Sequence, residues 1–106
     1  MKKGDIVLVP FPFTDLTGAK NRPALILAVF EGVIIVSFIT SQLKWHEEFD
    51  VLIIPDDSNS LKRVSILRLN KIVTLDKDLV LGKLGFLSGD HLINVYQNLV
   101  EMFKVE

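Results

Sequence analysis

The sequence predicts a mainly β protein, a small antiparallel barrel followed by one C-terminal helix. Short runs of aliphatic and β-branched residues recur along most of the chain, separated by Gly, Pro and polar turns. Many short strands in succession are typical of a barrel. From Asp90 onward the apolar residues Leu92, Val95, Tyr96, Leu99 and Phe103 instead recur at helical spacing, which predicts a helix that packs against the sheet.

The N-terminal part of the chain predicts three strands, joined by one long loop and one tight turn. The first two strands are predicted at residues 4–9 and 24–30. The loop between them, residues 10–22, contains two prolines and one glycine and is longer than a hairpin needs. Such connections often carry function. Glu31-Gly32 predicts a turn into a third strand, residues 33–39, antiparallel to the second.

Three more strands are predicted at residues 48–54, 64–69 and 71–75. A polar turn at residues 56–60 separates the first of these from the second. A kink near Asn70 separates the second from the third. These strands complete the predicted barrel.

The length and continuity of the chain predict one domain. The sequence has 106 residues, which is enough for one hydrophobic core and too few for two. The terminal helix is expected to begin with Ser88 or Asp90 as its N-cap. No linker, internal repeat or low-complexity tract divides the sequence. We therefore expect a single domain spanning residues 1–106.

The composition narrows the classes of function. The sequence contains no cysteine, which excludes disulfides, thiolate catalysis and cysteine-based metal sites and favours a reducing compartment. Glu31 and Gly32 interrupt the longest apolar stretch, and no secretory signal is expected, so a cytoplasmic protein with no membrane partner is predicted. The formal net charge is −1, so any surface for nucleic acid must be local.

No motif predicts a metal site or a cofactor. His46-Glu47-Glu48 lacks a second histidine one helical turn later, as a zinc pair would need. Asp57-Ser58-Asn59 lacks the glycine and the distal carboxylate of a calcium loop. The glycines of residues 82–89 do not have phosphate-loop spacing. A nuclease with two histidines as acid and base is disfavoured, because it would need both His46 and His91, and His91 opens the terminal helix.

Arg22 and Thr40 are the candidate site on sequence grounds. Arg22 precedes Pro23, which favours an extended backbone and directs the arginine out of the end of the loop. Thr40 opens three consecutive polar residues at the end of the third strand. Counted outward from the Glu31-Gly32 turn, Arg22 and Thr40 are nine and eight residues away, which places them opposite each other. The alternative interpretation is that Arg22 pairs with an acid such as Asp15 and Thr40 merely ends a strand.

Four segments carry a resemblance to a known family, and together they span nearly the whole chain. They are Gly4–Val9, Asn21–Leu27, Ile39–Gln42 and Ile72–Asp76, of which the Gly-Asp strand and the Arg-Pro strand are the most specific. In order and spacing they resemble the MazF/PemK toxins. The resemblance implies a Src-homology-3-like barrel of the MazF/PemK/CcdB type. It also implies that the catalytic arginine and hydroxyl of the family correspond to Arg22 and Thr40.

The activity that the resemblance implies is metal-independent, sequence-specific endoribonuclease cleavage of single-stranded RNA. The family acts as the toxin of a type II toxin–antitoxin system and inhibits growth and translation. It forms a homodimer, which an acidic antitoxin wraps so that the Arg22 face is covered, and the toxin–antitoxin complex binds DNA. The apolar strands also favour a homodimer without the resemblance, because a chain this small is expected to expose apolar surface.

The residue types agree with that chemistry. When the 2′-hydroxyl of RNA attacks the phosphate, a forked guanidinium can stabilise the charge that develops there and a hydroxyl can hydrogen-bond it. Arginine is a poor base, so the proton route stays open. Further RNA contacts are predicted at Thr17, Lys20, Asn21, Ser41, Gln42, Lys44 and Lys71. Any positive face must come from Lys20, Arg22, Lys44, Arg63, Arg68 and Lys71.

Aromatic side chains and other functions leave alternatives open. Phe11 and Phe13 are candidates to stack on a base, although core or interface packing is the favoured role. Trp45 beside Lys44 suits an RNA platform or a dimer contact equally well. Because one fold hosts several functions, a barrel that binds a protein such as DNA gyrase, as CcdB toxins do, and an idle RNA-binding barrel are the competing hypotheses.

Overall fold

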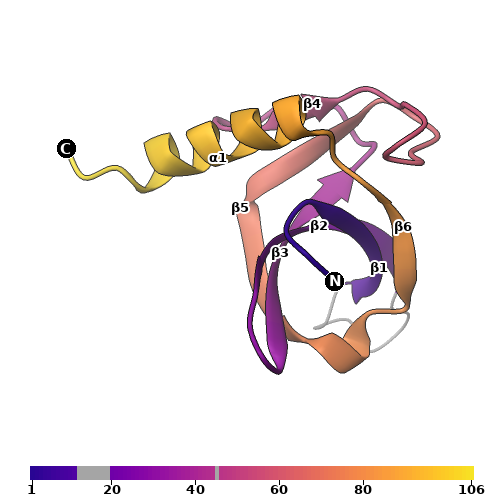
Figure 1. The fold of residues 1–106 in the computed structure, drawn as a ribbon. Coiled ribbons are helices and arrows are strands. Elements are labelled where there is room, and N and C mark those ends of the chain that lie inside the picture. Colours follow the sequence, from indigo (N-terminus) through magenta and orange to yellow (C-terminus); the bar gives the residue numbers. More distant parts are fainter. Residues whose placement is uncertain (12–19, 45) are drawn as a thin grey trace.

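The computed structural model describes residues 1–44 and 46–106 except 12–19, with only the backbone at Phe11. Within these residues six antiparallel strands form one curled sheet in the order β4-β5-β3-β2-β1-β6, and one helix follows (Figure 1). The strands and helices are β1 Asp5–Phe11, β2 Lys20–Val29, β3 Val33–Thr40, β4 Val51–Ile53, β5 Ser65–Asp76, a short 3₁₀ helix η1 Lys77–Leu79, β6 Gly82–Phe86 and α1 Gly89–Phe103.

The central strands bury side chains on both faces. In β2, Ala24 and Ile26 belong to one buried cluster, whereas Leu25 and Leu27 belong to the other. This is the alternation of a strand that is covered on both sides, and it explains why the sequence of these strands is continuously apolar. The cluster that contains Leu25 lies under α1, and the second cluster lies on the opposite face of β1, β2 and β3.

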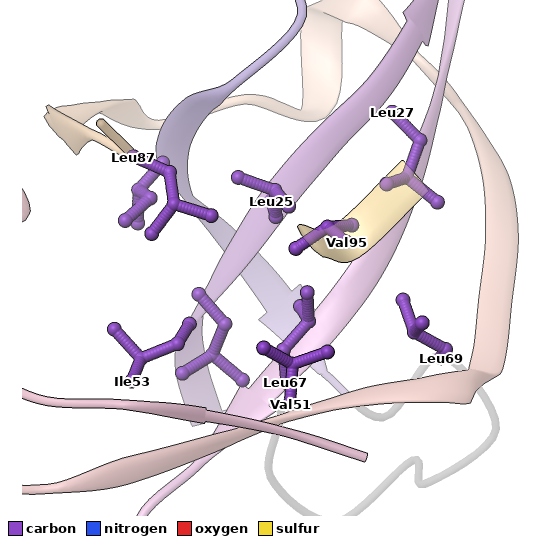
Figure 2. Close-up of a cluster of buried hydrophobic side chains, with 10 residues drawn as sticks. Leu25, Leu27, Val51, Ile53, Leu67, Leu69, Leu87 and Val95 are labelled. Atoms are coloured by element: carbon purple, nitrogen blue, oxygen red, sulfur yellow. The ribbon is translucent and has the colours of Figure 1, made fainter. Parts of the chain in front are cut away.

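The helix α1 covers the first cluster through one narrow face. Val95 is fully buried and lies among Leu25, Leu27 and Leu67 of the sheet (Figure 2). The hydroxyl of Tyr96 donates a hydrogen bond to the backbone carbonyl of Leu27, so a polar contact also ties the helix to β2. The last turns of α1 project beyond the sheet (Figure 1). Among the described residues, no helix is long and apolar enough to cross a membrane.

The helix begins as the sequence predicts. Ser88 is the N-cap, with extended φ and ψ, and its carbonyl accepts the first helical hydrogen bond from the Leu92 N–H at 2.9 Å. The Ser88 hydroxyl lies 3.0 Å from Nδ1 of His91. His91 therefore has a local role at the start of α1.

Gly4, which opens the Gly-Asp strand, is a crossing point of three elements. Its φ of 91° lies in the region that glycine alone adopts readily, and an added Cβ would come within 3.0 Å of Leu92. Its N–H donates to the Ile26 carbonyl at 2.9 Å, and its carbonyl accepts from the Leu87 N–H at 2.8 Å. A glycine at this position thus lets the N-terminus, β2 and the β6–α1 connection approach closely.

Asp5 is the buried charge beside that crossing. It is only 2% exposed, and its carboxylate accepts a hydrogen bond from the Lys2 N–H at 3.0 Å and forms an ion pair with Lys83 Nζ at 3.3 Å. A buried carboxylate needs such partners, because leaving it unpaired would be costly. The Gly4-Asp5 pair therefore stabilises the fold through these contacts.

Two of the sequence predictions need correction in the first half of the chain. The sequence predicts Arg22 and Pro23 at the end of the loop, but both lie within β2, opposite Val9 and Leu8 of β1. The predicted strand at residues 48–54 shrinks to Val51–Ile53. The first correction matters for function, because strand pairing fixes the backbone of Arg22 more firmly than a loop end would.

The second half of the chain differs from the prediction in β5 and β6. The sequence predicts two strands at residues 64–69 and 71–75, but β5 is one strand with a register shift at the predicted kink, where Ser37 pairs with Ile72 and Phe38 pairs with Arg68. The strand β6 is not predicted, because Gly82 and Gly85 interrupt its apolar pattern.

Gly85 has a specific reason to be glycine. The Phe86 N–H donates to the Ser58 carbonyl at 2.9 Å, which brings the turn at residues 56–60 against the outer edge of β6. An added Cβ at Gly85 would collide with the same carbonyl. This contact closes the curl of the sheet between β4 and β6.

Candidate active site

The hairpin of β2 and β3 places Arg22 opposite Thr40. The pairing runs from Val29↔Ile34 to Ala24↔Phe38, and continuing it by two residues brings Arg22 to Thr40. A bulge between Ile26 and Ala28 shifts the register by one residue. Without this bulge Arg22 would lie opposite Ser41, the residue after Thr40. The bulge therefore aligns the two candidate side chains.

Two small pockets flank the Arg22–Thr40 pair, and the pair forms the wall that they share. The Lys62 pocket, about 230 Å³, is lined by Arg22, Ile39 and Thr40 together with the polar residues Asn21, Ser41, Lys62, Arg63 and Ser65. The Lys71 pocket, about 240 Å³, is lined by the same three residues together with Phe38, Gln42, Arg68 and Lys71. Ser41 and Gln42, which follow Thr40, therefore serve opposite pockets.

Both pockets are strongly cationic. Arg22 contributes to each, with Lys62 and Arg63 added on one side and Arg68 and Lys71 on the other. Each pocket thus has three cationic side chains, and the charge of Arg68 is offset by its ion pair with Asp50. Among the described residues that line them, no carboxylate is present. The chain as a whole has a formal net charge of −1. The positive charge is thus concentrated at one place, and such a surface attracts a polyanion even on an acidic protein.

The Thr40 hydroxyl is held by a local turn. Its Oγ1 accepts a hydrogen bond from the backbone N–H of Gln42 at 3.1 Å. This is a serine/threonine turn, in which the hydroxyl accepts from the backbone N–H two residues later. Any residue except proline could supply that N–H, so the turn accounts for the hydroxyl at Thr40 but not for the glutamine at Gln42. Because the hydroxyl acts as an acceptor in this bond, its own hydrogen is directed elsewhere and can be donated to a ligand in the shared wall.

Arg68 is fixed in the Lys71 pocket by contacts on both of its ends. Its guanidinium forms an ion pair with Asp50 at 3.2 Å, and the Asp50 carboxylate is fully buried. The same carboxylate oxygen accepts the Glu47 N–H at 2.7 Å. The backbone carbonyl of Arg68 accepts a hydrogen bond from the hydroxyl of Ser37. Arg68 therefore connects the segment before β4 to the pairing of β3 with β5.

Similarity to known proteins decides the family. PemK-like, MazF-like toxins of type II toxin–antitoxin systems match residues 2–103 of the chain. The chain belongs to this family. No protein with a curated description matches the sequence significantly.

Several solved toxin structures share the fold of this family member. A mycobacterial endoribonuclease in complex with its cognate antitoxin is 18% identical, with a TM-score of 0.75 over 100% of this chain and 99% of that chain. A chain of the MazE–MazF complex from Deinococcus radiodurans is 22% identical, with a TM-score of 0.77 over 100% and 98%. The Mycobacterium tuberculosis toxin MazF-mt6 is 19% identical, with a TM-score of 0.74 over 96% and 98%. At these identities the likeness shows the fold, and it agrees with the predicted barrel and terminal helix.

The pockets bring together most of the predicted RNA-contact residues. Besides Arg22 and Thr40, they gather Asn21, Ser41, Gln42 and Lys71. Lys20 and Lys44 are exposed and line neither pocket. Thr17 lies outside the described residues, as do Asp15, Phe13, Trp45 and the side chain of Phe11.

Lys62 is the cationic pocket residue that the sequence patterns missed. It follows a polar turn, and a lysine after a turn ordinarily faces solvent. Arg63 and Arg68 are expected from sequence only as part of a general positive face. The signal that distinguishes them is long-range, because the contact of residues 56–60 with β6 sets the direction of the segment that carries Lys62 and Arg63. Within the described parts of the chain, no group of three or more histidine, aspartate or glutamate side chains could hold a metal ion.

Proposed function

We propose that this toxin is a sequence-specific, metal-independent endoribonuclease that cleaves single-stranded RNA, including mRNA, in the cytoplasm. The observation that carries the proposal is the wall formed by Arg22 and Thr40 between two cationic pockets. A phosphodiester chain that crosses this wall places one phosphate against a guanidinium and a hydroxyl, with further cations on both sides. Two of the solved neighbours are named endoribonucleases, which supports the same reaction class.

Arg22 stabilises the charge of the transition state. In the proposed reaction the 2′-oxygen bonds to phosphorus as the bond to the 5′-oxygen breaks, and negative charge accumulates on the non-bridging oxygens. The 2′-hydroxyl loses a proton, and the 5′-oxygen gains one. A guanidinium presents two parallel N–H donors to such a phosphate, and its side chain here is half-buried, which strengthens the contact.

Thr40 positions and stabilises the same phosphate. The hydroxyl is oriented by the Gln42 N–H, so its hydrogen can be donated to a non-bridging oxygen without losing a bond inside the protein. Asn21, Ser41 and Gln42 supply amide and hydroxyl groups at the two pockets, and such groups can read base edges of an unstacked RNA strand. They are our candidates for sequence specificity.

The proposed reaction needs no metal ion, because the cations that surround the phosphate are side chains. The test is incubation of the purified protein with a long single-stranded RNA in excess chelator, followed by mapping of the new ends. We expect discrete cuts with 5′-hydroxyl ends. Cleavage that disappears in chelator and returns with magnesium would contradict metal independence, and intact RNA under every condition would favour the gyrase-binding or idle-barrel alternatives.

The proposed protein partners are a cognate antitoxin and a second copy of the chain. Structurally similar toxins have been solved in complex with an antitoxin. The two cationic pockets of this chain would suit an acidic antitoxin segment that competes with RNA. For the second copy we propose the outer face of α1, where Ile93, Val100 and Phe103 are 59%, 65% and 70% exposed. An apolar stripe of this kind on a helix is typical of an interface. DNA binding would then be a property of the toxin–antitoxin complex.

A further inference from the structure

The segment that carries Lys62 and Arg63 is held in place from within the protein. Asn59 is fully buried and lies just upstream of it. Its side-chain N–H donates to the Ile54 carbonyl at 2.9 Å, and its side-chain oxygen accepts the N–H groups of Asp56 at 3.1 Å and Leu61 at 3.0 Å. One amide therefore binds the backbone on both sides of the turn, which fixes the path of the chain into residue 62.

A second set of hydrogen bonds closes the same turn on itself. The Asp56 carboxylate accepts the N–H of Ser58 at 2.9 Å and that of Asn59 at 2.8 Å. Ser60 has a φ of 58°, which reverses the chain direction within the turn. With the bond from Phe86 to the Ser58 carbonyl, the turn is anchored to β6 as well as to itself.

The downstream end of the segment is also fixed. The Ser65 hydroxyl, at the buried start of β5, donates to the Arg63 carbonyl at 2.9 Å. Lys62 and Arg63 thus occupy a short bridge with both ends tied, and their side chains line the pocket that Arg22 and Thr40 share. Cations on a fixed backbone lose less entropy when they bind an anion, so this pair binds more tightly than the same two side chains would on a free loop.

We propose that the Lys62 pocket is a second phosphate subsite for RNA, adjacent to the reacting phosphate. This inference rests on the proposed function, since it takes the Arg22–Thr40 wall as the place where the cleaved phosphate lies. The RNA backbone crosses that wall, and the neighbouring phosphate binds between Lys62 and Arg63. The subsite binds backbone charge and not base identity, so it contributes affinity for any single-stranded RNA.

The first experiment measures RNA affinity as a function of salt for the double variant Lys62→Ala/Arg63→Ala. The probe is a single-stranded RNA with 2′-fluoro groups, which lacks the attacking hydroxyl and stays intact. The slope of log affinity against log salt should become shallower by about 0.7 for each phosphate that the variant no longer neutralises, and affinity should fall roughly three- to tenfold at moderate salt. The control is Lys3→Ala/Lys104→Ala, which removes the same charge from exposed positions outside both pockets and should keep the wild-type slope.

The second experiment locates the phosphate. Neutral methylphosphonate linkages are placed one at a time along the same RNA. One position next to the cleaved linkage should weaken binding to the wild-type protein but not to the Lys62→Ala/Arg63→Ala variant. Equal reductions of affinity in both proteins at every position, or a double variant with the slope of the control, would overturn the subsite.

The outcomes separate this inference from the proposed function. A wild-type protein that cuts RNA but shows no change of slope in the double variant would reject the subsite alone. A wild-type protein that binds RNA with the predicted slopes but never cuts it would support the subsite and reject the nuclease. Folding is checked by the thermal unfolding midpoint, which should change little, because both side chains are exposed.

Discussion

The outer face of α1 and the two pockets beside Arg22 and Thr40 are hollows on the described part of this molecule that differ in size and chemistry. The α1 hollow, about 790 Å³, is lined mostly by apolar side chains such as Leu92, Ile93 and Val100. The pockets are each about a third of that volume, with three cationic side chains apiece, of which Arg68 is paired with Asp50. The larger hollow offers non-directional apolar burial, and the smaller ones offer oriented charge.

The difference shows that the volume of a hollow does not indicate where the reaction takes place in this protein. The hydroxyl of Tyr96, which lines the α1 hollow, is already bonded to a carbonyl of the sheet. An apolar hollow of this kind is filled by another apolar surface, whereas the charged pockets need a polyanionic ligand. Our proposal places self-association at α1 and RNA chemistry at the pockets, and the following substitutions test that division.

The largest effect is expected for Arg22→Ala. If Arg22 stabilises charge that develops mainly in the transition state, its removal should raise the barrier by about 2 to 4 kcal/mol, which slows single-turnover cleavage about a hundredfold or more. Affinity for RNA should fall much less. The measurement is cleavage under single-turnover conditions beside equilibrium binding. Near wild-type cleavage by a folded Arg22→Ala protein would contradict this role and would point to other residues, such as Lys20, Lys71 or His46, as the catalytic groups.

The next effect is expected for Val100→Glu on α1. Burying an unpaired carboxylate in an apolar interface should weaken dimerisation by about 2 kcal/mol or more, since the charge must be desolvated without a partner. Light scattering over a dilution series should show dissociation at higher concentration than for the wild type. Ile54→Glu is the matched control, because Ile54 is 60% exposed but lies outside the α1 hollow. Equal masses for both variants at every dilution would contradict the proposal that α1 forms the dimer interface.

A smaller effect is expected at Thr40. Thr40→Val keeps the shape and deletes the hydroxyl, so it should slow cleavage about tenfold, the worth of one hydrogen bond to a charged group. Thr40→Ser keeps a hydroxyl that can accept the Gln42 N–H, and it should retain more activity than Thr40→Val. Single-turnover rates of the two variants give the comparison. Equal rates would mean that the hydroxyl has no part in the reaction.

The smallest effect is expected for Tyr96→Phe, which removes the bond from α1 to the Leu27 carbonyl and should cost about 1 kcal/mol of stability. Desolvation by burial raises the pKa of Tyr96 above its ordinary value of 10.0. The folded protein therefore keeps this proton to higher pH than the unfolded chain, so its contribution is complete below pH 10 and is lost as pH rises beyond it. Denaturant unfolding at several pH values should show a flatter alkaline decline for Tyr96→Phe. Parallel declines would contradict this contribution.

The sequence predicts those parts of the structure that depend on local pattern. Continuous apolar runs locate β1, β2 and β3, helical spacing locates α1, and counting from one turn brings Arg22 to the same end of the hairpin as Thr40. The bulge between Ile26 and Ala28, which no sequence pattern indicates, sets the exact pairing. The strand β6 escapes prediction because Gly85 is required by a contact with the distant Ser58 and not by its own neighbours in sequence.

The same kind of distant contact hides part of the candidate site. Lys62 follows a turn whose sequence shows only polarity, and nothing local indicates that Asn59 is buried. The turn packs on β6, and this packing together with the bonds of Asn59 directs Lys62 and Arg63 toward Arg22. Counting across one hairpin locates a pairing to within one residue, and the bulge between Ile26 and Ala28 sets the final register. Contacts between residues that are far apart in the chain cannot be counted at all.

The most direct test of the central claim is the charge-preserving variant Arg22→Lys, assayed for single-turnover cleavage and RNA affinity on the same RNA. An ammonium keeps the positive charge of the wall but cannot form the two-pronged contact with a phosphate. We predict a cleavage rate close to that of Arg22→Ala, at least about thirtyfold below wild type, with RNA affinity within about threefold of wild type. A lysine variant that cleaves at nearly the wild-type rate would contradict the claim, because charge alone would then suffice at this position.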